Sequence, residues 1–428
     1  MDESLRALGM TRRGFVRTIG MAAGGMALAS LPGTMAALQR ARESGAGTLE
    51  VAVLVPRPAV PASAAGSLLA GLNLSLSRVG RKAGDLSITV VPQVIAPGPA
   101  AAVAATSALI VEGRADAVVG MLNPGALAHV RDLLERAGRV LITTDGGANV
   151  VRDAEQSAQI FHQSLGYWQS NWAMGDWLAR NLGRRGFLVS SLYESGFDAR
   201  YAFQHGFEAA GGTLLGSEVS HILPGDAGLT AIMSAIRAAR PDFVYGMFSG
   251  ADAVDFVQAY AAADLRGIPL AGSAFLVDEA ILARLGPAAA GVLSALPWAP
   301  TLDAAANRDF AARYRAAYSR DPGVQDLLGY DTGEILQAAA TASRAGGAAA
   351  LAQALGAVGF ASPRGPLTMS PDTRTAQTPV YLREVRQAGG ALVNAVVAML
   401  ASTTEVERRA GELRSGLRSG WTHSYLGT

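Results

Sequence analysis

Residues 115–149, ADAVVGMLNPGALAHVRDLLERAGRVLITTDGGAN, constrain the fold more than any other stretch of the chain. Two short apolar runs, 117–121 and 140–143, are typical of parallel strands that are buried on both faces. Between them, apolar residues recur at helical spacing after Asn123 and Pro124, which suit the cap and the first position of a helix. The order predicts a βαβ unit whose two loops leave the carboxyl ends of adjacent strands, the edge where open α/β sheets bind ligands.

The same alternation continues along the chain. Strands are predicted at 49–55, 86–91, 187–191, 242–246 and 380–385, and helices at 63–79, 100–113, 199–210, 230–239, 251–263, 307–318, 331–344 and 348–358. Strands that alternate with helices at this spacing indicate an α/β fold with parallel sheets. The second half repeats the architecture of the first without repeating its sequence, so the two halves share topology only.

Composition removes several classes of function. The 36 basic and 35 acidic residues of the 428 leave a net charge of +1, which is no electrostatic footprint for nucleic acid. Lys82 is the only lysine, so a phosphate-loop or Schiff-base lysine is close to excluded. The five histidines are scattered, and no zinc-protease, nucleophile-elbow or phosphate-loop motif is present, so neither a metal nor a cofactor is predicted.

The N-terminus predicts export. Residues 11–17, TRRGFVR, resemble a twin-arginine signal, and 19–29 form a weakly hydrophobic segment that is too short to span a bilayer stably. An ordinary helix with two exposed arginines is the alternative. We expect residues 1–47 to be signal peptide and linker, the Tat translocase to be the export partner, and the mature protein to be periplasmic. The chain has no cysteine and therefore no lipidation site, and two cleavage sites remain open.

An ordered set of segments suggests a family. The set comprises ADAVVG at 115–120, the loop at 144–149, PDFVY at 241–245 with Asp252 after it, GVL at 291–293, GYD at 329–331 and PRG at 363–365. From about 49 to 397 the chain resembles the branched-chain-amino-acid type of periplasmic solute-binding protein, which captures ligands for ABC importers. This resemblance implies partners: a small-molecule ligand and an ABC permease in the inner membrane. We expect a monomer with no nucleic-acid partner.

The resemblance also implies a fold. It is the two-lobed type I periplasmic-binding-protein fold, in which each lobe is a mostly parallel sheet flanked by helices and three hinge crossovers join the lobes. The crossovers are expected near 164–167, 295–298 and 373–378. Residues 48–165 with 297–375 would form the N-terminal lobe and 166–296 with 376–400 the C-terminal lobe. Residues 401–428 would form a polar C-terminal tail.

One half of the implied ligand site comes from the two loops of the opening stretch. In the family, backbone N–H groups and hydroxyls there hold the ligand's carboxylate. The corresponding positions here are Asn123, Pro124, Gly125, Gly146, Gly147, Ala148 and Asn149. Two hydroxyls common in the family are missing, while the backbone donors and the helix N-terminus remain. The alternative is that Asn123 and the glycines serve only capping and turns.

The other half comes from the second lobe. Asp252 stands at the acidic position that contacts an amino group, or alternatively is a simple helix N-terminal acid. Ser195 replaces a common tyrosine, and aromatic walls could come from Tyr167, Trp168, Tyr193, Phe197 and Phe248, for which ordinary packing is the alternative. Arg57 lies in a predicted cleft loop. The expected function is hinge-closed capture of a small carboxylate, amino-acid-like or amide ligand without catalysis. The alternatives are a sensing protein that presents its closed form to a membrane receptor and, with less support, a cleft enzyme.

Overall fold

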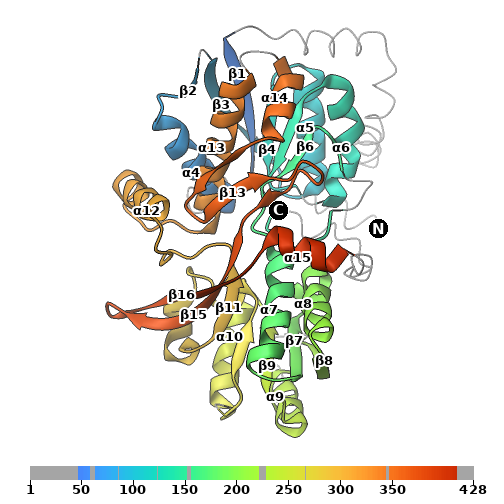
Figure 1. The fold of residues 1–428 in the computed structure, drawn as a ribbon, viewed down its shortest axis with the longest axis vertical. Helices are drawn as coiled ribbons and strands as arrows, with labels where there is room; N and C mark the ends of the chain where they lie inside the picture. Colours follow the sequence, from blue (N-terminus) through green and yellow to red (C-terminus); the bar gives the residue numbers. More distant parts are fainter. Residues whose placement is uncertain are drawn as a thin grey trace, which may run out of the picture.

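The computed structural model describes residues 47–57, 63–84, 86–122, 124–151, 156–220, 228–265, 267–343 and 347–411. The predicted export signal and the cap residue Asn123 therefore lie outside the described residues. Two mostly parallel sheets, each flanked by helices, form an upper and a lower lobe in Figure 1. The α/β architecture predicted from the alternation of apolar runs is confirmed.

The first sheet has six strands in the order β2-β3-β1-β4-β5-β6, and all pairs except β2–β3 are parallel. Its strands are β1 (Thr48–Pro56), β2 (Lys82–Ala83), β3 (Leu86–Ile95), β4 (Ala117–Gly120), β5 (Val140–Thr143) and β6 (Ile160–His162). The helices that follow β1, β3 and β4 are α4 (Ala64–Ser77), α5 (Pro99–Val111) and α6 (Pro124–Ala137). Strands β4 and β5 are buried throughout, which explains their continuous apolar sequence.

The second sheet has seven strands in the order β16-β15-β11-β10-β9-β7-β8. Its strands are β7 (Arg185–Ser191), β8 (Thr213–Ser220), β9 (Phe243–Met247), β10 (Leu270–Gly272), β11 (Leu293–Leu296), β15 (Pro379–Ala388) and β16 (Ala391–Ser402). The helices of this half are α7 (Tyr167–Asn181), α8 (Asp198–Ala209), α9 (Gly228–Ala239), α10 (Gly250–Ala262) and the short α11 (Leu282–Leu285). Strands β15 and β16 join the parallel strands as an antiparallel hairpin.

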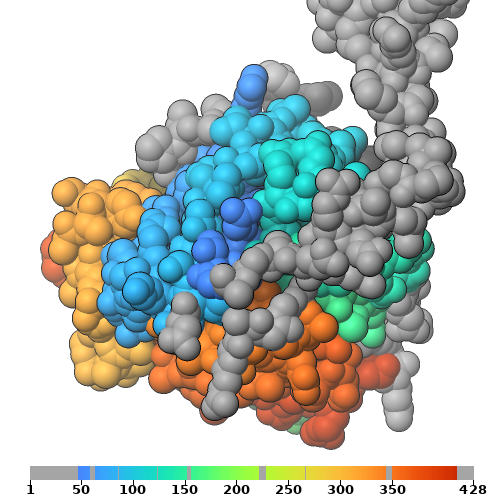
Figure 2. All heavy atoms as spheres, turned by 90° about the horizontal axis from the view of Figure 1, so that it is seen from above, coloured from blue at the N-terminus to red at the C-terminus, as the bar shows by residue number. Residues whose placement is uncertain are grey.

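The chain passes between the two halves three times. It leaves the first sheet after β6 and enters the second half at α7. It returns after β11 through α12 (Ala305–Tyr318), α13 (Val324–Ser343) and α14 (Gly347–Leu355) to a small sheet of β12 (Gly359–Ser362), β13 (Gly365–Met369) and β14 (Ala376–Gln377). It then crosses again into β15. In Figure 2 the blue segments near the start of the described chain lie beside orange segments that follow β11, in agreement with the packing of α4 against α13.

Helix α13 begins at Val324, before the predicted helix start at residue 331, and its first turns pack closely against α4. A Cβ added to Gly329 would lie 1.9 Å from the Leu68 carbonyl oxygen, and one added to Gly71 would lie 1.9 Å from the Asp326 carbonyl oxygen. Two glycines that weaken the helical pattern in the sequence are therefore what allows the two helix backbones to touch.

The structure corrects the start of the polar tail predicted at 401–428, of which it describes residues 401–411. Residues 401 and 402 complete β16, and Thr403–Ala410 form α15. The Ser402 hydroxyl caps this helix by accepting from the Glu405 N–H at 3.1 Å, and Val406 and Ala410 are buried at helical spacing. Helix α15 packs against α7 between the two lobes. In the described part of the chain, none of the helices has the length and apolar character of a membrane span.

Candidate ligand-binding cleft

The loop 144–151, between β5 and β6, is the part of the predicted site that the structure connects most directly to the other lobe. The carbonyl oxygens of Gly146, Gly147 and Ala148 accept hydrogen bonds from the backbone N–H groups of Tyr167, Trp168 and Ala199, at 3.2, 2.9 and 2.9 Å. Tyr167 and Trp168 begin α7, and Ala199 lies in the first turn of α8. The predicted ligand loop is thus docked onto the N-termini of two helices of the second half.

Asn149 and Asp198 strengthen this docking. The Asn149 Oδ1 atom accepts from the Asp198 N–H at 3.1 Å, and the Asp198 Oδ2 atom accepts from the Val150 N–H at 3.1 Å. Asp198 and Val150 are only 3% and 2% exposed. The first two N–H groups of α8 are therefore satisfied by the opposite lobe, so this helix N-terminus is not open to an anion.

The loop's own donors are also partly used. The Asp145 carboxylate accepts from the backbone N–H of Gly147, while burial raises the pKa of Asp145 to about 7. The Asp145 carboxylate therefore competes with a ligand for the Gly147 N–H, which the sequence predicted as a backbone donor to the ligand's carboxylate. Gly147 has a φ of +70°, and a Cβ there would lie 2.7 Å from the Ser164 hydroxyl oxygen, so the position requires glycine.

A cavity lies where this loop meets the second half. Both lobes and the crossovers contribute to its lining: Pro124, Asp145, Gly147, Asn149, Val151, His162, Ser164, Trp168, Gln169, Thr375 and Glu407. Its volume of about 20 Å³ admits roughly one water molecule. A ligand with several heavy atoms therefore needs the lobes to separate or the lining side chains to move. Burial without a compensating charge lowers the pKa of His162 to about 4, so this histidine is neutral near pH 7.

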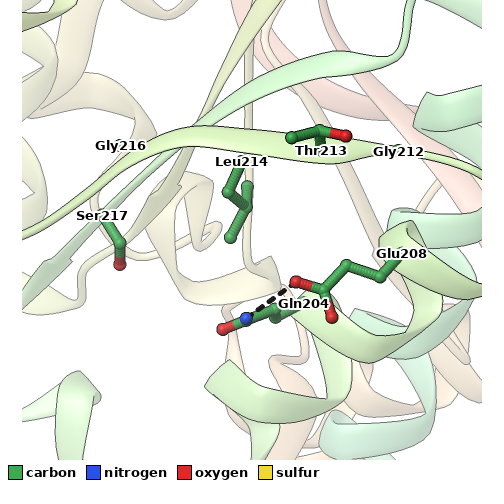
Figure 3. Close-up of a pocket in the computed structure, with 7 residues that line it drawn as sticks. All are labelled: Gln204, Glu208, Gly212, Thr213, Leu214, Gly216 and Ser217. Atoms are coloured by element: carbon green, nitrogen blue, oxygen red, sulfur yellow. Dashed lines mark hydrogen bonds between the residues drawn. The ribbon is translucent and has the colours of Figure 1, made fainter.

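A larger hollow lies on the surface of the second half, away from the interlobe cavity. Figure 3 shows it between α8 and the edge strand β8, with a volume of about 450 Å³, lined by Gln204, Glu208, Gly212, Thr213, Leu214, Gly216 and Ser217. It is open to solvent, and its one acid accepts from the Gln204 amide at 2.8 Å. None of the predicted site residues lines it. Its size reflects an exposed sheet edge rather than converging groups, so we place the functional site at the interlobe cavity.

On the second half, the sequence did not single out the most deeply buried acid at the carboxyl edge of the sheet. Glu194 follows β7 in a short 3-10 turn and is 2% exposed. Its carboxylate accepts from the Tyr167 hydroxyl at 3.1 Å and from the Ser249 hydroxyl. Burial raises its pKa to about 7, against these hydrogen bonds, and the nearby Asp252 charge raises it further. The sequence did offer one signal for Glu194, namely that it is an acidic residue in the first loop after a predicted parallel strand.

The Tyr167 side chain links this acid to the first crossover. Burial and the neighbouring Glu194 raise the pKa of Tyr167 well above its usual value, so its hydroxyl is a neutral donor. Its ring contacts Phe275 with 4.8 Å between centroids. Trp168, the next residue, is 3% exposed and lines the interlobe cavity. Both aromatics predicted at the start of α7 therefore lie at the junction of the lobes.

Of the remaining predicted residues of the second half, some are exposed at the surface and one belongs to the hydrophobic core. Tyr193 is 44% exposed and meets the Phe197 ring edge-on at 5.4 Å. Ser195 donates to the Leu192 carbonyl at 2.7 Å within its own turn. Phe248 is fully buried and stacks on Phe256 at 4.2 Å, so its environment is that of a core residue and not of a cleft wall.

Three further predicted residues, Asp252, Pro124 and Gly125, lie in the first turns of helices. Asp252 is partly exposed in the first turn of α10, and burial, with a contribution from Asp255, raises its pKa. Pro124 is buried at the start of α6 and lines the cavity, while Gly125 is exposed. Among the described residues, no three histidine, aspartate or glutamate side chains gather as a metal site would require.

Known proteins resemble this chain over most of its length. Residues 48–391 match the periplasmic binding protein family. A Leu/Ile/Val-binding protein homolog from Brucella melitensis is 26% identical over 329 residues, covering 74% of this chain and 83% of that protein.

Two solved structures share both the fold and part of the sequence. A solute-binding protein of an R. palustris ABC transporter, in complex with benzoate, is 30% identical with a TM-score of 0.69, covering 83% of this chain and 97% of that one. An ABC transporter substrate-binding protein from Sphaerobacter thermophilus is 28% identical with a TM-score of 0.76, covering 83% and 98%. The chain therefore belongs to the periplasmic binding protein family, as a solute-binding component of an ABC importer related to the branched-chain-amino-acid binding proteins.

Proposed function

We propose that the chain captures a small carboxylate, aromatic or amino-acid-like, in the cleft between its lobes and delivers it to an ABC permease. The observation that carries this proposal is the meeting of loop 144–151 with the start of α7 around the interlobe cavity. Aromatic and backbone groups converge there from both lobes. The benzoate complex of the R. palustris relative supports an aromatic carboxylate, and the Brucella relative supports an amino acid.

The lobes of this proposal are those expected from the sequence, 48–165 with 297–375 and 166–296 with 376–400. In this proposal the lobes move apart to admit the ligand, because the cavity between them admits only about one water molecule. The groups that would face the ligand are Trp168 and Pro124 together with the polar atoms of loop 144–151. Glu194 and Tyr167 do not line this cavity; they are buried and hydrogen-bonded to each other beside the start of α7.

A thermal-shift screen of the mature chain tests the proposal. The panel contains benzoate, 4-hydroxybenzoate, leucine, isoleucine, valine and benzamide. A ligand at about 100 times its Kd should stabilise the folded protein by roughly 2.7 kcal/mol, which raises Tm measurably. Isothermal titration calorimetry then gives the Kd of each responding compound. Absence of any shift across the panel, together with chemical conversion of one compound, would support the enzyme alternative instead.

We further propose that the mature protein is a periplasmic monomer exported by the Tat translocase. The support is the Arg12-Arg13 pair ahead of a short, weakly hydrophobic segment. Replacing both arginines by lysine should leave the full-length protein in the cytoplasm, as followed by fractionation and immunoblotting. Periplasmic delivery at the wild-type level would refute this route. Light scattering of the mature chain tests the monomer.

A further inference from the structure

Asp198 connects the two lobes at the loop that carries the predicted ligand contacts. It is the first residue of α8, in the second half, and its Oδ2 atom accepts from the Val150 N–H at 3.1 Å. Its own N–H donates to Asn149 Oδ1 at 3.1 Å. We name Asn149, Val150 and Asp198 the interlobe clasp. Val150 and Asn149 follow β5 of the first sheet, so an opening motion that separates this loop from α8 would break both hydrogen bonds.

Burial raises the energetic cost of losing the hydrogen bonds of the clasp. Asp198 is 3% exposed and Val150 is 2% exposed, so neither group of this hydrogen bond has ready access to water while the lobes are closed. A buried N–H that loses its acceptor carries its full desolvation cost, and a hydrogen bond to a carboxylate is stronger than one to a neutral acceptor. The clasp therefore stabilises the closed arrangement specifically, because water can satisfy the same groups once the lobes open.

The clasp also fixes the loop that contacts the cavity. Asn149 and Gly147 line the cavity, and the carbonyl oxygen of Ala148, between them, accepts a hydrogen bond from the Ala199 N–H at 2.9 Å. Each residue from 146 to 150 thus makes a hydrogen bond to α7 or α8. The position of the loop relative to Trp168 is set by the second lobe as much as by its own sheet.

We propose that Asp198 is a positioning residue for ligand capture: its carboxylate holds loop 144–151 in the closed arrangement and so slows ligand release. This inference rests on the proposed function, namely that the lobes close over a cleft ligand. A competing account gives Asp198 only a local role, since an acid in the first turn of a helix stabilises that helix by its charge. The two accounts predict different results for Asp198→Asn, because asparagine can still accept the hydrogen bond but carries no charge.

Four proteins separate them: wild type, Asp198→Ala, Asp198→Asn and Glu208→Ala. Asparagine keeps an oxygen that can accept from the Val150 N–H but loses the charge that acts on the helix. Glu208 is the control because it is an exposed acid on the same helix, bonded to Gln204 on the outer side (Figure 3). Binding of benzoate, or of the best compound in the panel, is followed by calorimetry and by stopped-flow tryptophan fluorescence, for which Trp168 at the cavity is a natural probe.

The expected result is a loss of affinity that comes mainly from a higher dissociation rate of the ligand. Asp198→Ala should raise Kd by about tenfold or more, with most of the change in the dissociation rate and the association rate within about threefold. Asp198→Asn should stay within about threefold of wild type, and Glu208→Ala should match wild type. Equal dissociation rates for Asp198→Ala and wild type would overturn the inference. Equal losses in the alanine and asparagine variants would assign the effect to the helix instead.

A second measurement needs no ligand. The natural chain has no cysteine, so cysteines placed at the exposed positions Ala128 on α6 and Ala238 on α9 can carry a fluorescence donor and acceptor on opposite lobes. Asp198→Ala should shift the ligand-free distance distribution toward the open form, whereas Glu208→Ala should not. If no compound in the panel binds the wild-type protein, the proposed function fails, and the fluorescence distances alone decide the clasp. Unchanged distances in Asp198→Ala would then overturn it.

Discussion

Asn149 and Asp198, 49 residues apart in the chain, cap each other's segments across the junction of the two lobes. The Asn149 side chain accepts from the first N–H of α8, and the Asp198 side chain accepts from the N–H of the residue after Asn149. The reciprocity resembles a capping box, with the two partners supplied by different lobes. A helix N-terminus that could serve an anion is used here to hold a loop, so ligand recognition has to come from other groups of the cleft.

The neighbouring glycine pair offers a matched test of how tightly that loop is held. Gly147 has φ +70° and no room for a Cβ beside Ser164, whereas a Cβ at Gly146 would meet nothing within 4 Å. Gly147→Ala should destabilise the fold by roughly 1–2 kcal/mol for the left-handed conformation alone, with the steric clash added to that. Gly146→Ala should remain within about 0.5 kcal/mol of wild type. Urea denaturation followed by circular dichroism measures both, and equal midpoints would show that the loop relaxes freely.

Much of the fold could be predicted because buried parallel strands have a distinct sequence. The apolar run 140–143 coincides with β5, and the run 49–55 lies within β1. Strand β8 was missed because it is an edge strand with little buried apolar surface, in which Ser217 and Glu218 are exposed. Helix α15 was missed because its sequence is mostly polar and charged, with only a few apolar residues, Val406 among them, on its one buried face.

The site was less predictable, for a physical reason. The sequence places loops at the carboxyl edge of each sheet, and the family resemblance pointed to Asn149 in one of them, while Tyr167 and Trp168 were predicted as aromatic walls. It cannot say which groups meet across the lobes, so Asp198 and Glu194 were not singled out. Their importance follows from partners 49 and 27 residues away and from burial, and neither is visible in local spacing. Phe248 was selected by its position after β9, but its ring faces Phe256 in the core.

The buried ion pair at the first crossover should be essential for stability. The Arg364 guanidinium donates to Asp331 at 2.8 Å, to the Ser164 carbonyl at 2.8 Å and to the Gln163 side chain at 3.0 Å, and both charged residues are fully buried. Arg364→Ala leaves the Asp331 charge uncompensated, which should cost about 3–5 kcal/mol of unfolding free energy.

The exposed pair of Arg386 and Glu384 is the control for this substitution. Arg386→Ala removes a 2.6 Å ion pair at the surface and should cost no more than about 1 kcal/mol. Urea midpoints of the two variants measured side by side give the comparison. Similar losses in the two variants would mean that the crossover tolerates an unpaired Asp331, contrary to expectation. Adding Asp331→Leu to the Arg364 variant should recover part of the loss, because the unpaired charge is then gone.

Asp252 separates the ligand classes that remain open in the proposed function. If the ligand carries an ammonium group that contacts this carboxylate, Asp252→Asn should weaken binding by about 2–5 kcal/mol. A ligand without a cationic group, such as benzoate, should lose much less. Calorimetry with leucine and benzoate on wild type and variant makes the distinction. Leucine binding both proteins equally would reduce Asp252 to an acid that stabilises the start of α10.

Glu194 should impose a pH dependence on stability that a neutral isostere removes. Burial raises its pKa from 4.5 to about 7, so the folded protein retains this proton over a range in which the unfolded chain has released it. Its contribution to stability is therefore fully present below about pH 4.5 and is lost as pH rises through about 7. Over that interval the loss is on the order of 3 kcal/mol, from about 1.4 kcal/mol per pKa unit.

The measurement is the difference in unfolding free energy between wild type and Glu194→Gln at pH 5, 6, 7 and 8. Subtraction is needed because Asp145, whose pKa burial also raises to about 7, titrates in both proteins and cancels. Wild type should lose stability relative to the glutamine variant steadily from pH 5 to 7 and level off above it. The same subtraction with Glu208→Gln, an exposed acid on α8, provides the matched control. Parallel curves for wild type and Glu194→Gln would mean that the Glu194 carboxylate is charged throughout, held so by the Tyr167 and Ser249 hydroxyls.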